Sequence, residues 1–134
     1  MAPTRYRGFL APMAKRSLQP MTHYLVSFPA SAMSHIAAED LPSVGESARA
    51  VIREAKAAGV YVFGGGIDEG VTPVMVASDG TIKNGAYPET QRLNGGFCVL
   101  KVPTREEAVA WAAKIAAACQ CAQELRQFGY DPES

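Results

Sequence analysis

The sequence predicts an α+β domain in which two helices cover one face of an antiparallel sheet. Strand-like and helix-like patterns follow one another as strand, helix, strand, hairpin, strand, helix and strand. The chain has 134 residues, of which 48% are hydrophobic, and these values suit a single domain with its own core. Two strand–helix–strand halves of this kind predict the ferredoxin-like βαββαβ arrangement, here with an inserted β-hairpin.

The expected strands are rich in aromatic and β-branched residues. They cover residues 22–28, 60–63, 96–102 and 123–128, and the second runs into three consecutive glycines. The inserted hairpin is expected where Asp79-Gly80 separates two apolar runs, because both central positions of such a turn tolerate positive φ.

Each expected helix follows a capping-box pattern, formed by Ser43 with Glu46 and by Thr104 with Glu107. Behind each pattern, apolar residues recur at helical spacing. These residues are Val44, Ala48, Val51, Ile52 and Ala55 in the first helix, and Ala108, Trp111, Ala112, Ile115 and Cys119 in the second. Since such helices cover one face of the sheet, the other face needs a cover, and a homodimer is the simplest.

Residues 1–20 are expected to form a flexible basic N-terminal arm ahead of a domain at residues 21–134. The arm carries four basic residues and no acidic one, so it is +4 and the rest of the chain is −4. A start codon assigned too early, an organelle transit peptide and a nucleic-acid-binding arm are alternative interpretations. The net charge of zero gives no indication of a nucleic-acid partner.

The composition also bears on location. No apolar run reaches the about 18 residues of a membrane span, so no membrane partner is expected. The three cysteines are an odd number, and two of them, Cys119 and Cys121, lie too close in sequence for an easy mutual bridge. A disulfide framework is therefore not expected, and a cytoplasmic location is favoured.

A family resemblance rests on residues 84–90, which read Asn-Gly-Ala-Tyr-Pro-Glu-Thr, and on the residues that follow them. Those residues are Gly95-Gly96-Phe97, Pro103, Glu107-Ala108 and Trp111-Ala112. Together they resemble the YCII-related family, and more narrowly its DGPF branch, whose signature is Asp-Gly-Pro-Phe, one residue, Glu, and then Gly-Gly-Phe. The resemblance spans about residues 21–128.

The resemblance implies a dimeric α+β barrel, in which two ferredoxin-like units join their sheets and enclose small cavities. One relative is a dehydrochlorinase acting on a chlorinated hydroxyquinol, and similar barrels include muconolactone isomerases. Members of the DGPF branch are often encoded beside extracytoplasmic-function sigma factors. Asn84, Ala86 and Tyr87 depart from the signature, and Ala48 stands where some members carry a helix histidine proposed to pair with an aspartate. That His–Asp chemistry is therefore not expected here.

Glu89, which matches the motif glutamate, and His23 are the candidate catalytic residues. A carboxyl group beside apolar strands, or a neutral imidazole in a half-buried pocket, can act as acid or base near neutral pH. The alternatives are a glutamate that fixes its loop by hydrogen bonding to the backbone and an ordinary strand histidine. Tyr87 is either a hydrogen-bond donor to a ligand or a packing aromatic.

Three further residues are candidate ligand-binding positions: Asn84 in the motif, Asp68 after the triple glycine, and Gly65 within it. Asp68 with Glu69 could transfer a proton, or be a solvated loop pair. Gly65 lies in a run that favours a bend or a close backbone approach. Cys119 and Cys121 lack further ligands nearby in sequence, so no metal and no cofactor are expected.

Two functions remain open at this point. One is a cofactor-free enzyme that isomerises a small cyclic or aromatic compound, or eliminates a group from it, by proton transfer, with Glu89, His23 and Tyr87 around the pocket. The other is a non-catalytic dimeric module that binds a small molecule or a protein, within a sigma-factor pathway. The reaction class comes from the barrel resemblance alone.

Overall fold

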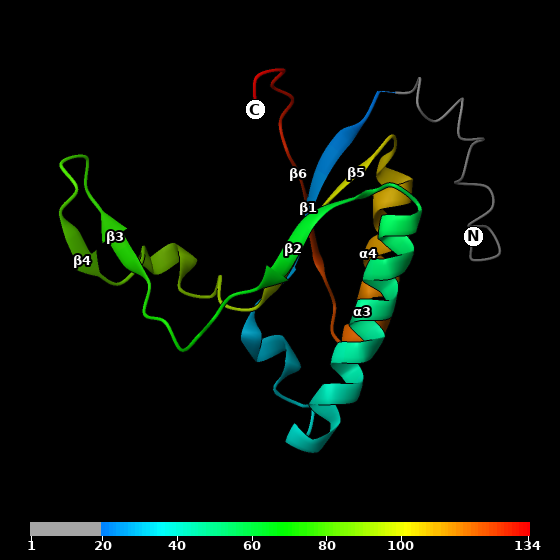
Figure 1. Ribbon diagram of the computed structural model, residues 1–134, viewed down its shortest axis with the longest axis horizontal. Coiled ribbons are helices and arrows are strands. Elements are labelled where there is room, and N and C mark those ends of the chain that lie inside the picture. Colours follow the sequence, from blue (N-terminus) through cyan, green and yellow to red (C-terminus); the bar gives the residue numbers. More distant parts are fainter. Residues whose placement is uncertain (1–19) are drawn as a thin grey trace.

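The computed structural model describes residues 20–134, which form an antiparallel sheet backed by two long helices (Figure 1). The four-stranded sheet has the order β2-β5-β1-β6. Its strands are β1 (Thr22–Phe28), β2 (Tyr61–Gly66), β5 (Gly96–Val102) and β6 (Glu124–Gln127), and the helices are α3 (Leu41–Ala57) and α4 (Arg105–Cys119). The α+β prediction is confirmed, and the arrangement is compatible with a ferredoxin-like fold. The predicted N-terminal arm, apart from its last residue, lies outside the described residues.

The core lies between the sheet and the helices, and the strand pleat decides which residues enter it. In β1 and β5 the side chains of Tyr24, Val26 and Leu100 are buried against the helices. The alternate residues of β1, His23 and Leu25, face the other side, which no helix in the described part of the chain covers (Figure 1). We call this second side the open face, and its existence confirms that the helices lie on one side only.

The apolar residues that recur at helical spacing, called here the helix stripes, pack into this core. Ala55 of α3 and Ala108, Trp111 and Ala112 of α4 are buried, and Val51 packs against them from a partly exposed position. Burying one large apolar side chain stabilises the fold by about 1.5–3 kcal/mol, so these stripes hold both helices on the sheet.

The two predicted capping boxes have different outcomes. Thr104 is the N-cap of α4, and its Oγ1 accepts a hydrogen bond from the amide of Glu107 at 3.1 Å, so this cap is confirmed. The cap expected at Ser43 is wrong, because α3 already begins at Leu41 and Ser43 donates its hydroxyl to the Asp40 carbonyl at 3.1 Å. Pro42 explains the earlier start, since its fixed φ and missing N–H suit the first turn of a helix.

Two segments depart from their predicted limits. The region 29–39, between the first predicted strand and the first predicted helix, contains the short 3-10 helix η1 (Ala30–Met33) and the start of η2 (Ala38–Asp40). The second strand continues through the three glycines instead of ending at residue 63. At Gly64 an added Cβ would lie 2.4 Å from Tyr61 Oη and 2.6 Å from Cys98 Cβ, so this glycine allows the close approach of β2 to β5.

The inserted hairpin is confirmed, and residues 67–94, which contain it, are called here the projecting hairpin. Its strands β3 (Val74–Val76) and β4 (Ile82–Asn84) pair antiparallel, and Gly80 adopts a φ of +89° at the turn. A short helix, η3 (Pro88–Thr90), leads back to the sheet. The projecting hairpin extends away from the helices, on the side of the open face (Figure 1).

Candidate functional site

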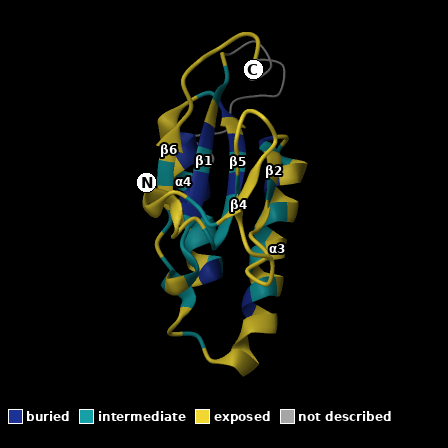
Figure 2. Ribbon diagram, turned by 90° about the vertical axis from the view of Figure 1, so that its left-hand side faces the viewer, coloured by how far each residue is buried: buried dark blue, intermediate teal, exposed yellow. Residues whose placement is uncertain are grey.

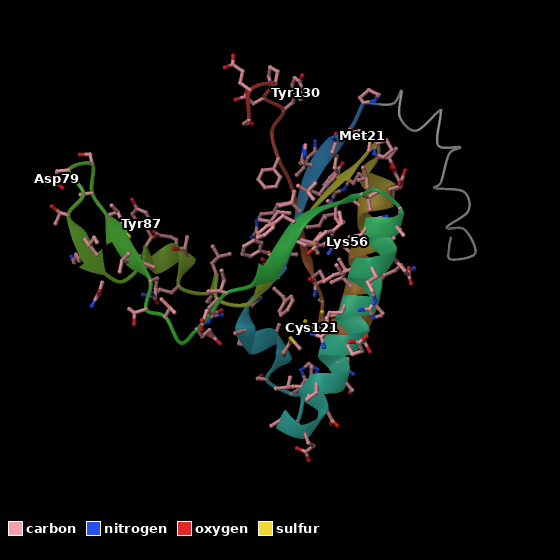
Figure 3. The ribbon with its side chains drawn as sticks, in the orientation of Figure 1. Met21, Lys56, Asp79, Tyr87, Cys121 and Tyr130 are labelled. Atoms are coloured by element: carbon pink, nitrogen blue, oxygen red, sulfur yellow. The ribbon has the colours of Figure 1, made fainter. Side chains whose placement is uncertain are left out.

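A cavity of about 360 Å³ lies at the end of the sheet where β1 begins and the chain leaves β6. Its lining residues come from these two places and from β5. They are Met21, Thr22, His23, Val99, Gln127, Phe128, Gly129, Tyr130, Asp131 and Ser134. Figure 3 shows Met21 and Tyr130 at this end of the molecule.

The sheet side of the cavity belongs to the open face. His23 and Val99 point there, because the neighbouring Tyr24 and Leu100 fill the core on the opposite side. Phe128 is tied to the same end of β1, since its amide donates to the His23 carbonyl at 3.0 Å. The C-terminal segment that follows β6 supplies the remaining wall.

The cavity combines apolar side chains with a few polar ones. Met21, Val99 and Phe128 give an apolar surface, while His23 and Asp131 supply an imidazole and a carboxylate. Small-molecule sites are usually of this kind, with volumes of about 300–1,000 Å³ and few polar groups.

The structure places the other candidate residues elsewhere. Tyr87 and Glu89 are both exposed on the projecting hairpin, with Tyr87 63% accessible, and Figure 3 shows Tyr87 well away from Met21 and Tyr130. Asn84 ends β4, and Asp68 Oδ1 accepts the amide of Gly70 at 2.9 Å. These residues share the hairpin but do not enter the cavity.

The separation follows from the register of the sheet. His23 pairs with Lys101, whereas Phe28 pairs with Gly96, next to the base of the hairpin. The five residue steps from His23 to Phe28 span about 17 Å at about 3.4 Å per step. Gly65 pairs with Phe97 and therefore lies at the hairpin end of the open face. Within one chain, His23 lies at one end of the sheet, and the hairpin that carries Glu89 leaves the sheet at the other end.

The thiols and one tyrosine have shifted acidities. Burial raises the pKa of the Cys98 thiol to about 11, with a further contribution from Cys119. Burial also raises the pKa of Cys119, of Cys121 and of Tyr61. All three cysteines are free thiols, so at neutral pH they are protonated and poor nucleophiles. Among residues 20–134 no group of three or more His, Cys, Asp or Glu is placed to hold a metal ion.

The C-terminal side of the cavity was not predicted from the sequence. Tyr130 and Asp131 follow the last strand, where no periodic pattern indicates their position. The signal that could have found them is the run Phe128-Gly129-Tyr130, which places two aromatic residues directly after an edge strand.

Comparisons with protein families and with curated proteins found no match for this chain. Within residues 20–134, no helix is both long enough and apolar enough to cross a membrane.

Proposed function

We propose that this chain is a YCII-related, DGPF-like protein that works as a homodimer and binds a small cyclic or aromatic molecule at the open face of its sheet. The cavity of about 360 Å³ beside His23 is the observation that carries the binding proposal. The three free cysteines support a reducing, cytoplasmic setting for it.

The homodimer part of the proposal rests on the open face. Phe63 of β2 is 62% exposed and pairs with Val99, so an aromatic ring lies on this face without a cover from residues 20–134. A second copy packed there would remove that ring from water and would close the cavity on the side that faces away from the sheet. Two sheets joined in this way make the dimeric α+β barrel that the family resemblance implies.

Binding can be tested with the two histidine rings of the chain as reporters. Benzoate, cyclohexanone and hydroquinone are titrated into the full-length protein, and the imidazole C–H signals are followed by NMR. A ligand in the cavity shifts the His23 signals saturably and leaves those of His35 in place, because His35 lies between the exposed ends of η1 and η2. If no compound moves the His23 signals, the cavity is not a site for this class of ligand.

Catalysis is the stronger form of the proposal. If the protein is an enzyme, Glu89 or His23 removes a proton from a carbon next to a carbonyl group of the substrate. The same residue returns the proton to that carbon or to a conjugated carbon. Because the proton is returned, the isomerisation needs no cofactor. Cyclohexanone in D₂O reports this step directly, because a bound base exchanges its α-protons for deuterium. The enzyme proposal predicts protein-dependent exchange that is lost in Glu89→Gln and in His23→Gln.

The alternative is the non-catalytic ligand- or protein-binding module of a sigma-factor pathway. The separation of His23 from Glu89 within one chain favours it, because a catalytic pair needs both groups at one substrate. Saturable binding at His23 without deuterium exchange would support the module. Exchange that survives both substitutions would exclude these two residues from the chemistry.

A further inference from the structure

The projecting hairpin presents apolar side chains that nothing else within residues 20–134 covers. Val74, Val76 and Ile82 are 46%, 65% and 64% exposed, and Figure 2 shows the hairpin almost wholly in the colour of exposed residues. A two-stranded hairpin alone in water is marginally stable, since it has no core to bury its side chains. Among the described residues, this segment therefore lacks the packing that such hairpins need.

Its base is nevertheless fixed to the body. The Ile67 amide donates to the Gly95 carbonyl at 2.8 Å, and Asn94 Nδ2 donates to Glu69 Oε2 at 3.0 Å. An added Cβ at Gly95 would lie 2.1 Å from the Phe28 carbonyl oxygen, so the backbones are in close contact there. The hairpin is thus held outward by its base rather than by packing along its length.

The exposed apolar residues collect on one side of the molecule. Of the thirteen large hydrophobic side chains exposed among residues 20–134, two lie on the helices and eleven lie on β2, the projecting hairpin or the C-terminal segment. The hairpin leaves the sheet on the side of the open face (Figures 1 and 2). One partner could therefore contact the hairpin and the open face together.

The charges of the two surfaces are complementary. The projecting hairpin has four acidic and two basic residues and a net charge of −2. The open face carries Lys101 and Arg126 against Glu124, which gives +1 with His23 neutral. The open face of one copy therefore suits the projecting hairpin of another copy better than it suits a second open face, which carries a net charge of the same sign.

We propose that the projecting hairpin of each copy packs across the open face of the other copy, so that the two copies clasp each other reciprocally. The proposal rests on the homodimer proposed above and names the segment that forms it. A reciprocal contact is what two-fold symmetry requires, because each copy gives a hairpin and receives one. It brings Tyr87 and Glu89 of one copy to the face that carries His23 of the other, so the site would be completed between copies.

Photocrosslinking between isotopically distinct copies tests this contact. The photoreactive residue p-benzoylphenylalanine replaces Tyr87 in one variant and Ile82 in a second, so that one failed variant does not end the test. Protein labelled with ¹⁵N and unlabelled protein are unfolded and refolded together, irradiated and digested, and the crosslinked peptides are identified by mass spectrometry. The control variant carries the same residue at Val109, which is 49% exposed on α4.

The clasp predicts mixed ¹⁵N–¹⁴N peptide pairs that join the hairpin position to β1, β5 or β6, and none from position 109. Crosslinks within one chain only, or to α3 or α4 of the second copy, would overturn it. Light scattering on the same samples separates the two proposals. A dimer without these crosslinks refutes the clasp and leaves the homodimer standing, whereas a monomer refutes both.

Discussion

The Ala30 amide donates a hydrogen bond to Asn94 Oδ1 at 3.0 Å, across 64 positions of sequence. This bond ties the last residue of the projecting hairpin to the segment that follows β1. Since Asn94 also bonds Glu69, one amide side chain joins both ends of the hairpin to the body.

Asn94→Ala should therefore lower the free energy of unfolding by about 1–2 kcal/mol, because the partly buried Ala30 amide loses its acceptor. Amide hydrogen exchange should accelerate within residues 67–94 and stay unchanged in the helices. Thr90→Ala is the control, since its hydroxyl bonds the Tyr87 carbonyl at the exposed surface. Equal effects of the two substitutions would contradict the role given to Asn94.

Gly95→Ala should be far more harmful than Gly65→Ala. The new Cβ at position 95 would lie 2.1 Å from the Phe28 oxygen and 2.7 Å from the Ala30 nitrogen, both backbone atoms that cannot rotate aside. We expect a loss of at least about 3 kcal/mol or no folding. At Gly65 an added Cβ meets nothing within 4 Å, so we expect a change below about 1 kcal/mol. Urea unfolding followed by circular dichroism measures both, and similar values would contradict the packing at position 95.

The two helix starts give a third prediction. Thr104→Ala removes the acceptor of the Glu107 amide and should cost about 1 kcal/mol of stability. Ser43→Ala should cost less than about 0.5 kcal/mol, because this hydroxyl only donates to the Asp40 carbonyl in an exposed turn. The comparison is made by thermal unfolding at one pH. A larger loss at position 43 would mean that Ser43 caps α3 after all.

The hairpin turn at Asp79-Gly80 and the start of α3 show what sequence patterns can and cannot predict. Local sequence signals predicted the conformation correctly where it depends on neighbouring residues alone. At Asp79-Gly80, for example, Asp79 Oδ1 accepts a hydrogen bond from the Thr81 amide, and Gly80 has a positive φ. The local signals failed at Ser43, because Pro42 allowed the helix to begin earlier. Apolar periodicity predicted the helix faces, since burial follows the helical repeat.

The candidate site was less predictable, because it depends on sheet register and on the path of irregular segments. Period-two alternation could place His23 on one face or the other, but it could not place His23 at the end of the sheet opposite the base of the hairpin. The hairpin was predicted, whereas its projection from the sheet was not, because that direction depends on long-range bonds such as the one between Ala30 and Asn94.

Because the Cys98 thiol is buried, we expect the protein to lose stability at high pH. Its thiol pKa rises from the ordinary 9.0 to about 11 on folding, so both states are protonated below pH 9. Between these values the unfolded thiol ionises first, so rising pH favours unfolding by up to about 1.4 kcal/mol per pH unit.

Urea unfolding between about pH 8.5 and 10.5, which covers the lower part of this window, compares the wild type with Cys98→Ala. The slope of stability against pH should be shallower in Cys98→Ala. Cys121→Ala, at the partly exposed thiol, is the control and should keep a slope closer to that of the wild type. Equal slopes in the wild type and Cys98→Ala would contradict the burial effect.

The central claim is that a second copy of the chain covers the open face. The most direct test is the mass of the protein in solution, measured by sedimentation equilibrium at low micromolar concentration. The account predicts twice the mass of one chain for the wild type and for Val109→Asp on α4. It predicts the mass of a single chain for Phe63→Asp, which places a charge on the open face. A wild-type protein with the mass of one chain at every concentration tested would contradict it.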